Sequence, residues 1–264
     1  MRTHFAWMVT PFVLMAAVGC SEAKEVKSTE TAVVAQATET PSAAPAAPAA
    51  AGHVTGKIMF SGTQPTLKKL DMAADPVCQG LHAGAVHSET VLVNANGTLK
   101  NVFVYVKKGL EGKTFPAASE KVKFDQHTCM YDPHVMGVRV GQPIEIVNSD
   151  TTLHNVHAMA KVNPEFNYGM PFEGMALPAQ FDKPEIMVKV KCDVHPWMNA
   201  YIGVVEHPHF AVTGDDGSFD LGELAPGEYV IEAWHEYYAA QTQTITVPAA
   251  GEVVFTFAHT EGGA

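Results

Sequence analysis

The sequence lacks the short motifs that carry most catalysis, and it is poor in basic residues. It contains no nucleophile elbow, no glycine-rich phosphate loop and no paired carboxylates in an active-site context. Lys and Arg number 17 against 28 Asp and Glu, and the resulting net charge of −11 is spread along the chain. Nucleic acid is therefore excluded as a partner, because phosphate binding requires clustered cations. A basic protein partner is compatible with this charge.

Long stretches of helical periodicity are also missing. From His53 onward, apolar and polar residues alternate over short runs that end at turn residues such as Asn96-Gly97 and Asp216-Gly217. The clearest strands are expected at 101–107, 135–140, 143–148, 186–192 and 200–206. Many short strands without helices predict an all-β protein built from antiparallel sandwiches.

The apolar run Phe5–Val18 is too short to cross a bilayer and has the length of a signal-peptide core. It leads into "AAVGC", which resembles a bacterial lipobox, in which the cysteine is lipidated. We expect residues 1–20 to be a signal peptide with its lipobox and Cys20 to be the lipidation site. The protein would then be a lipoprotein on the periplasmic side of the bacterial cell envelope, held to a membrane by its lipid. An ordinary cleaved signal peptide is the alternative, and both routes lead to an oxidising compartment.

Large apolar residues are scarce from 21 to 52, where Ala, Thr and Pro dominate. Such a segment cannot bury enough surface to fold, so we expect a disordered, extended linker that separates the folded part from the membrane.

A cysteine, a histidine and a methionine stand close together in "CDVHPWM", where Cys192, His195 and Met198 have the spacing C-x2-H-x2-M. One loop cannot complete a four-coordinate site with these three, so a second histidine must come from elsewhere. The best candidate is His154, which follows the expected strand 143–148. One thiolate, two imidazoles and a distant thioether are the ligands of blue-copper sites. Zinc is disfavoured because methionine is a poor zinc ligand and the spacing is not that of zinc fingers.

The same segments carry a family resemblance. "HNV" at 154–156, "CDVHPWM" and the closing strand "AYIGVVE" resemble the cupredoxins, in particular the amicyanin and plastocyanin type, over residues 92–206. The resemblance implies a Greek-key sandwich that holds one mononuclear copper ion. It implies as ligands His154, Cys192, His195 and Met198. It also implies that Asn155 fixes the ligand loops by hydrogen bonds near the sulfur.

Three neighbours of these residues have expected roles. Pro196 and Trp197 would form the electron-transfer and docking patch, with the His195 imidazole edge near the surface as the electron exit. The alternative for Trp197 is packing against the domain that follows. His157 is expected not to be a ligand, because residues 154 and 157 of a strand point to opposite faces.

The segment "GDDGSFDLGELAPGEYVIEAWHE" resembles the carboxypeptidase regulatory-like, or prealbumin-like, β-sandwich. We therefore expect a cupredoxin domain at 53–207 and a second small sandwich at 208–260. "GHVTGKIMFSGTQP" resembles the first strand of that second family. Under this alternative, strand 53–62 belongs to the second sandwich, which is then split around the first.

Two cysteines remain after Cys20 and Cys192 are assigned. In an exported protein, Cys78 and Cys129 are expected to pair in a disulfide, which would close a loop of about fifty residues. One alternative is that they bind a second metal ion. Another is that they neither pair nor bind metal. The residues of that alternative site would be Cys78, His82, His87, His127, Cys129 and His134.

The expected function is single-electron transfer between periplasmic or membrane redox partners, such as a cytochrome or a dehydrogenase. We expect no enzyme, because four protein ligands leave no open coordination position for a substrate. One alternative is a copper-binding protein for storage, delivery or sensing without electron transfer. Another is an adhesion or scaffold protein whose sandwiches bind glycan or protein.

Overall fold

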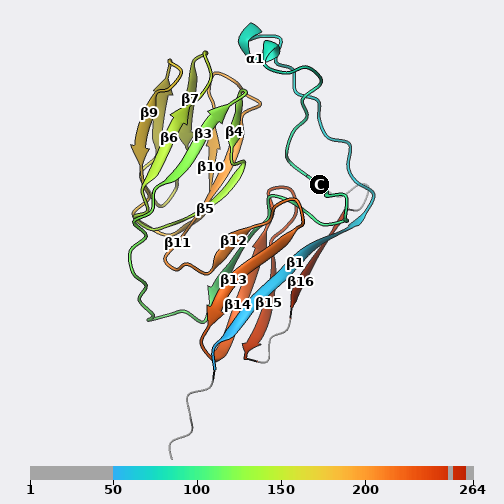
Figure 1. The fold of residues 1–264 in the computed structure, drawn as a ribbon, viewed down its shortest axis with the longest axis vertical. Helices are drawn as coiled ribbons and strands as arrows, with labels where there is room; N and C mark the ends of the chain where they lie inside the picture. Colours follow the sequence, from blue (N-terminus) through green and yellow to red (C-terminus); the bar gives the residue numbers. More distant parts are fainter. Residues whose placement is uncertain (1–49, 249–251, 260–264) are drawn as a thin grey trace, which may run out of the picture. The chain divides into compact units, whose positions relative to one another are not determined.

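The computed structural model describes residues 50–248 and 252–259. The expected signal peptide, Cys20 and the linker up to residue 49 lie outside this range. The described part falls in one compact unit and is almost entirely β-structure (Figure 1). The predicted all-β class is confirmed. In these residues no helix has the length and apolar character needed to span a bilayer.

The larger sandwich consists of a five-stranded and a four-stranded sheet (Figure 1). The first sheet has the order β5 (Val135–Arg139), β11 (Asn199–Val205), β10 (Glu185–Lys191), β7 (His154–Ala158) and β8 (Phe166–Met170). The second has the order β4 (Met130–Asp132), β3 (Val122–His127), β6 (Ile144–Asn148) and β9 (Ala176–Ala179). The chain passes repeatedly from one sheet to the other, as in a Greek-key sandwich.

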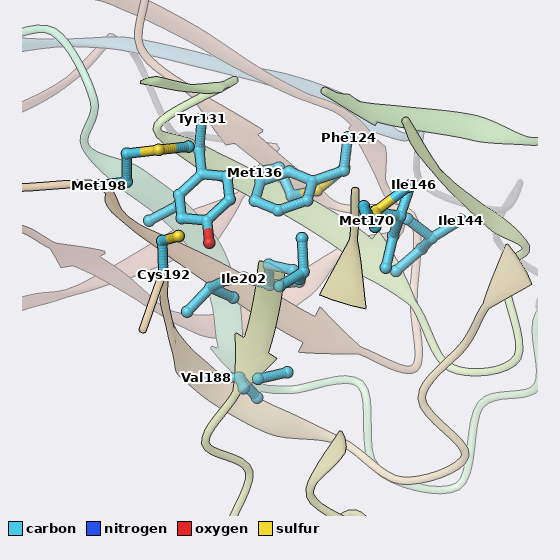
Figure 2. Packing of buried hydrophobic residues seen from close by; sticks show 14 of the residues in the cluster. Phe124, Tyr131, Met136, Ile144, Ile146, Met170, Val188, Cys192, Met198 and Ile202 are labelled. Atoms are coloured by element: carbon cyan, nitrogen blue, oxygen red, sulfur yellow. The ribbon is translucent and has the colours of Figure 1, made fainter. Parts of the chain in front are cut away.

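One buried cluster fills the space between these two sheets. It includes Phe124, Tyr131, Ile146, Val188 and Ile202, which come from strands of both sheets (Figure 2). The period-two pattern explains the arrangement, because alternate residues of a strand face the same side. Most strand pairs in these two sheets are antiparallel as expected, but β5–β11 and β3–β6 are parallel.

The smaller sandwich combines strands from both ends of the described chain. Its sheets have the orders β13 (Ser218–Leu224), β1 (Gly52–Gly62), β16 (Val253–His259) and β12 (Phe210–Val212), β2 (Phe103–Lys108), β14 (Gly227–Trp234), β15 (Gln241–Val247). This arrangement matches the split-sandwich alternative for strand 53–62, because β1 pairs with β13 and β16.

The expected domain boundary needs a correction at β2. The expected first domain at 53–207 includes β2, but β2 lies between β12 and β14 in the smaller sandwich. The four residues 103–106 are all buried, so β2 shows no alternation that would reveal its sheet. Val104 and Val106 enter the core of the smaller sandwich, whereas Phe103 and Tyr105 join a cluster with residues of β5 and β11.

Residues 63–102, here called the covering segment, connect β1 to β2 with little regular structure. They contain the five-residue helix α1 (Pro76–Gly80) and a few isolated β-bridges. The Asp75 side chain caps α1 by accepting hydrogen bonds from the backbone N–H of Val77 and Cys78, and Pro76 occupies the first turn. The cap fixes the orientation of Asp75 and Cys78, which both reach the candidate site.

Candidate metal centre

Two loops at one end of the larger sandwich supply the expected ligands. The loop between β10 and β11 is closed by hydrogen bonds from Cys192 N–H to the Met198 carbonyl (3.1 Å) and from Met198 N–H to the His195 carbonyl (3.0 Å). These bonds hold all three side chains on one rigid turn. His154 begins β7 and is fully buried, and the three loop residues are also buried.

The structure brings three of the four expected ligands to one point. The ligand atoms of His154, Cys192 and His195 all lie within 4.8 Å of one another. Nδ1 of His154 lies 2.9 Å from Nδ1 of His195, which is 3.9 Å from the Cys192 sulfur. Met198 is buried in the same core cluster as Cys192, and Figure 2 shows both near Tyr131. A thiolate, two imidazoles and a nearby thioether fit copper better than a hard cation such as Mg²⁺ or Ca²⁺.

The outer edge of each imidazole contacts a carboxylate. His154 Nε2 lies 2.9 Å from Asp150 Oδ2, and His195 Nε2 lies 3.0 Å from Asp75 Oδ2. Such contacts fix the ring orientation and leave the δ-nitrogens to face the sulfur. Sequence reasoning missed both carboxylates. Asp150 stands four residues before His154, which is a weak signal, but nothing in the sequence links Asp75 to a histidine 120 residues away.

Asn155 lies where the cupredoxin resemblance implies it. Its Oδ1 accepts hydrogen bonds from the Asp193 N–H (2.7 Å) and from the Cys192 thiol (3.3 Å). Its Nδ2 donates to Asn167 Oδ1 (2.7 Å) and to Asp193 Oδ2 (3.2 Å). The side chain therefore ties β7 to the ligand loop beside the sulfur.

Electrostatics in the metal-free site favour a charged thiolate. Burial raises the pKa of the Cys192 thiol, but hydrogen bonds from His154 and from loop amides lower it more, so the pKa lies below its usual value. Burial lowers the pKa of His154, whereas Asp150 and Cys192 raise it further, to about 9. Burial also lowers the pKa of His195, and the contact with Asp75 only partly opposes this.

The expected exposed edge of His195 is not found, because the covering segment lies over it. His195 is 3% exposed, and its Nε2 lies 3.7 Å from the Cys78 sulfur as well as against Asp75. The Trp197 ring packs on His195 at 4.9 Å and donates from Nε1 to the Cys129 carbonyl (3.0 Å). Trp197 is thus half-buried over the site rather than against the next domain, whereas Pro196 is exposed.

Cys78 and Cys129 form a disulfide with an S–S distance of 2.06 Å, and Cys192 is the free cysteine of the described residues. The alternative second metal site does not assemble in this disulfide-bonded chain. Among the described residues, no group of potential metal ligands contains the histidines proposed for it, His82, His87, His127 and His134. His157 lies outside the ligand group, between Asp193 and Glu165.

Comparison with known proteins gives partial similarities. No protein-family model and no curated protein matches the chain. The copper-containing nitrite reductase (NirK) of Thermus scotoductus SA-01 is 22% identical over 38% of this chain, with a TM-score of 0.29, and the match spans 25% of the reductase. A purple cupredoxin from Nitrosopumilus maritimus is 19% identical over 31% of this chain and 98% of its own, with a TM-score of 0.28.

An oxidised point mutant of amicyanin is 21% identical over 38% of this chain and 97% of its own, with a TM-score of 0.29. The resemblance of residues 208–260 to a prealbumin-like module stays a prediction. The fold follows from the strand arrangement. Two sheets of five and four strands enclose one core, and the loops with the candidate ligands lie at one end. The chain is all-β and contains a sandwich consistent with the cupredoxin-like fold.

Proposed function

We propose that this protein is a mononuclear blue-copper electron carrier. The observation that carries the proposal is the convergence of His154, Cys192 and His195, whose ligand atoms lie within 4.8 Å of one another in a buried pocket. Met198 would be the fourth and weakest ligand. Bound copper would supply a one-electron couple, and no open position would remain for a substrate, so we propose no enzymatic activity.

The residues around the pocket would keep it rigid during electron transfer. Asp75 and Asp150 orient the two imidazoles, and Asn155 joins β7 to the ligand loop. A site held by hydrogen bonds from several elements changes little between oxidation states, which suits electron transfer.

The partner would be a redox protein such as a cytochrome or a dehydrogenase. Because His195 is covered, the docking patch would centre on the exposed part of the ligand loop, Val194 and Pro196, with Trp197 beside it. We also propose that the protein is exported to the periplasmic side of the bacterial cell envelope and anchored through lipidated Cys20.

Burial of the site supports one second candidate, a copper-binding protein for storage, delivery or sensing. The covering segment leaves His195 3% exposed, which hinders direct contact between the imidazole and a redox partner. A shielded ion is what storage requires. Slow or partner-dependent release of Cu(I) without electron exchange would favour this candidate.

The test is to load the protein with Cu(II) and to record optical and EPR spectra beside a Cys192→Ser variant. Thiolate coordination predicts an intense visible absorption band and a narrow copper hyperfine splitting in the wild type only. Rapid reduction by a redox protein would then separate electron transfer from storage. Identical spectra for the two proteins would show that the sulfur is not a ligand and would overturn the proposal.

A further inference from the structure

In each of the two histidines of the site, the two ring nitrogens have different neighbours. Their δ-nitrogens face Cys192, whereas their ε-nitrogens face a second group of potential ligands. Ligand atoms of Asp75, Cys78 and His195 lie within 4.8 Å of one another, and so do those of Cys129, Asp150 and His154. The Cys78–Cys129 disulfide joins these two groups.

We propose that reduction of the Cys78–Cys129 disulfide creates a second copper(I) site beside the first. The two thiolates would be its ligands, because paired soft sulfur atoms select Cu(I) over harder cations. His195 Nε2, 3.7 Å from the Cys78 sulfur, places this site against the first one. The inference rests on the proposed function only for the choice of copper as the metal.

The reductant in this step would be a dithiol that exchanges with protein disulfides. One thiolate of that dithiol attacks one of the two sulfurs to form a mixed disulfide, and its second thiol then releases the protein. Two electrons and two protons pass to the protein, which is left with two thiols while the dithiol becomes a disulfide. Binding of one Cu(I) ion then displaces the two thiol protons.

The covering segment has the features of a region that opens locally. Both disulfide cysteines are fully buried, so access requires movement of α1 and its neighbours. Between residues 71 and 90, the buried side chains are Met72 and Cys78 alone, and the only helix has five residues. Few buried contacts and little regular structure correspond to a low free energy of local opening. The polar contacts to break include those of Asp75 with Thr152 (2.8 Å) and with His195, and that of His82 Nε2 with the Thr128 carbonyl (2.9 Å).

The experiment counts Cu(I) ions by native mass spectrometry and by competition with a Cu(I) chelator, before and after anaerobic reduction with a phosphine and removal of the reductant. Titration of free thiols in denaturant checks that two thiols are gained. We compare the wild type with Cys192→Ser and with the double variant Cys78→Ser/Cys129→Ser. The wild type should bind one Cu(I) when oxidised and two when reduced.

The variants distinguish the second site from the first. Cys192→Ser should lose the first ion but still gain one on reduction, whereas the double variant should bind one ion in either state. A reduced wild type that has gained two thiols and still binds one Cu(I) would overturn the inference. So would a disulfide that is reduced only after global unfolding.

Two outcomes separate this inference from the proposed function. If the oxidised wild type binds no copper while the reduced protein binds one, the blue-copper proposal fails and the second site stands. If the double variant does not fold, as judged by circular dichroism, the wild type and Cys192→Ser still provide the gain on reduction that the inference requires.

Discussion

Among the residues around the candidate site, Asn155 makes four side-chain hydrogen bonds. It contacts the Cys192 sulfur, the Asp193 backbone and the Asn167 side chain at once. A side chain that satisfies several buried polar groups costs more to remove than a single bond suggests, because its partners lose their hydrogen bonds too.

Asn155→Ala is therefore expected to lower the free energy of unfolding of the metal-free protein by roughly 2 kcal/mol. It should also weaken copper retention, because the ligand loop loses its tie to β7. Denaturant unfolding and chelator competition measure the two effects. Asn167→Ala is the control, since it removes the exposed side chain that bonds to Asn155 and to the Asp193 carboxylate but leaves the bonds of Asn155 to Cys192 and to the Asp193 backbone. Equal losses in both variants would contradict this role.

At the scale of the elements, one disulfide bond attaches the covering segment to the larger sandwich. The disulfide spans 51 residues and joins α1 to the turn between β3 and β4. In the chain-entropy description, closing a loop of this length stabilises the folded state by about 4 kcal/mol.

The double variant Cys78→Ser/Cys129→Ser is expected to lose about that amount of stability. It should also expose the ε-edge of His195, because α1 is no longer held over it. Denaturant unfolding gives the first quantity, and the rate of hydrogen exchange at the amides of residues 70–80 gives the second. Unchanged exchange in this segment would show that Asp75 and the apolar contacts hold α1 without the disulfide.

β1 tests the split arrangement of the smaller sandwich. A Cβ atom on Gly56 would lie 1.9 Å from the Val253 carbonyl oxygen and 2.3 Å from the Phe219 ring, on both neighbouring strands. Gly56→Ala should therefore destabilise the protein by roughly 3 kcal/mol. Gly84→Ala, where a Cβ meets nothing within 4 Å, should be close to neutral. Thermal unfolding of both variants makes the comparison, and a neutral Gly56→Ala would place β1 elsewhere.

The strands themselves were predictable, but the sandwich to which β2 belongs was not. The expected strands at 143–148 and 186–192 correspond to β6 and β10 within one residue, because their patterns repeat every second residue. The apolar pattern of β2 does not show to which sandwich it belongs, because its two faces contact different buried clusters. Cys192, His195 and Met198 could be grouped as candidate ligands because they are close in sequence. Asp75 could not, because only tertiary structure brings it to His195.

At the scale of the whole described molecule, the two sandwiches share contacts. Phe103 and Tyr105 of the smaller one cluster with Val135 and Val205 of the larger one. Near this cluster His134 Nε2 lies 2.5 Å from Glu236, and both side chains are buried. Glu89 lies 3.8 Å from His134 Nδ1. The two sandwiches are therefore expected to unfold together.

The His134–Glu236 pair predicts a pH dependence. Burial lowers the pKa of His134, but the bond to Glu236 raises it more, so the pKa lies above its usual value. The stabilisation is therefore complete below about pH 6.5 and is lost as the pH rises through the raised pKa. His134→Gln should cost roughly 3 kcal/mol at pH 6 and clearly less at pH 9. Denaturant unfolding of metal-free protein at both values checks this, with exposed His87→Gln as the control. A cost independent of pH would mean that the pair is not charged.

The place of β1 in the chain has a consequence for biosynthesis. Its partners β13 and β16 come about 160 and 190 residues later. At a translation rate of roughly 5–20 residues per second, the ribosome needs on the order of 10 to 40 seconds to supply them. Until β13 is made, β1 lacks both of its partner strands, and the larger sandwich is complete before the smaller one can close.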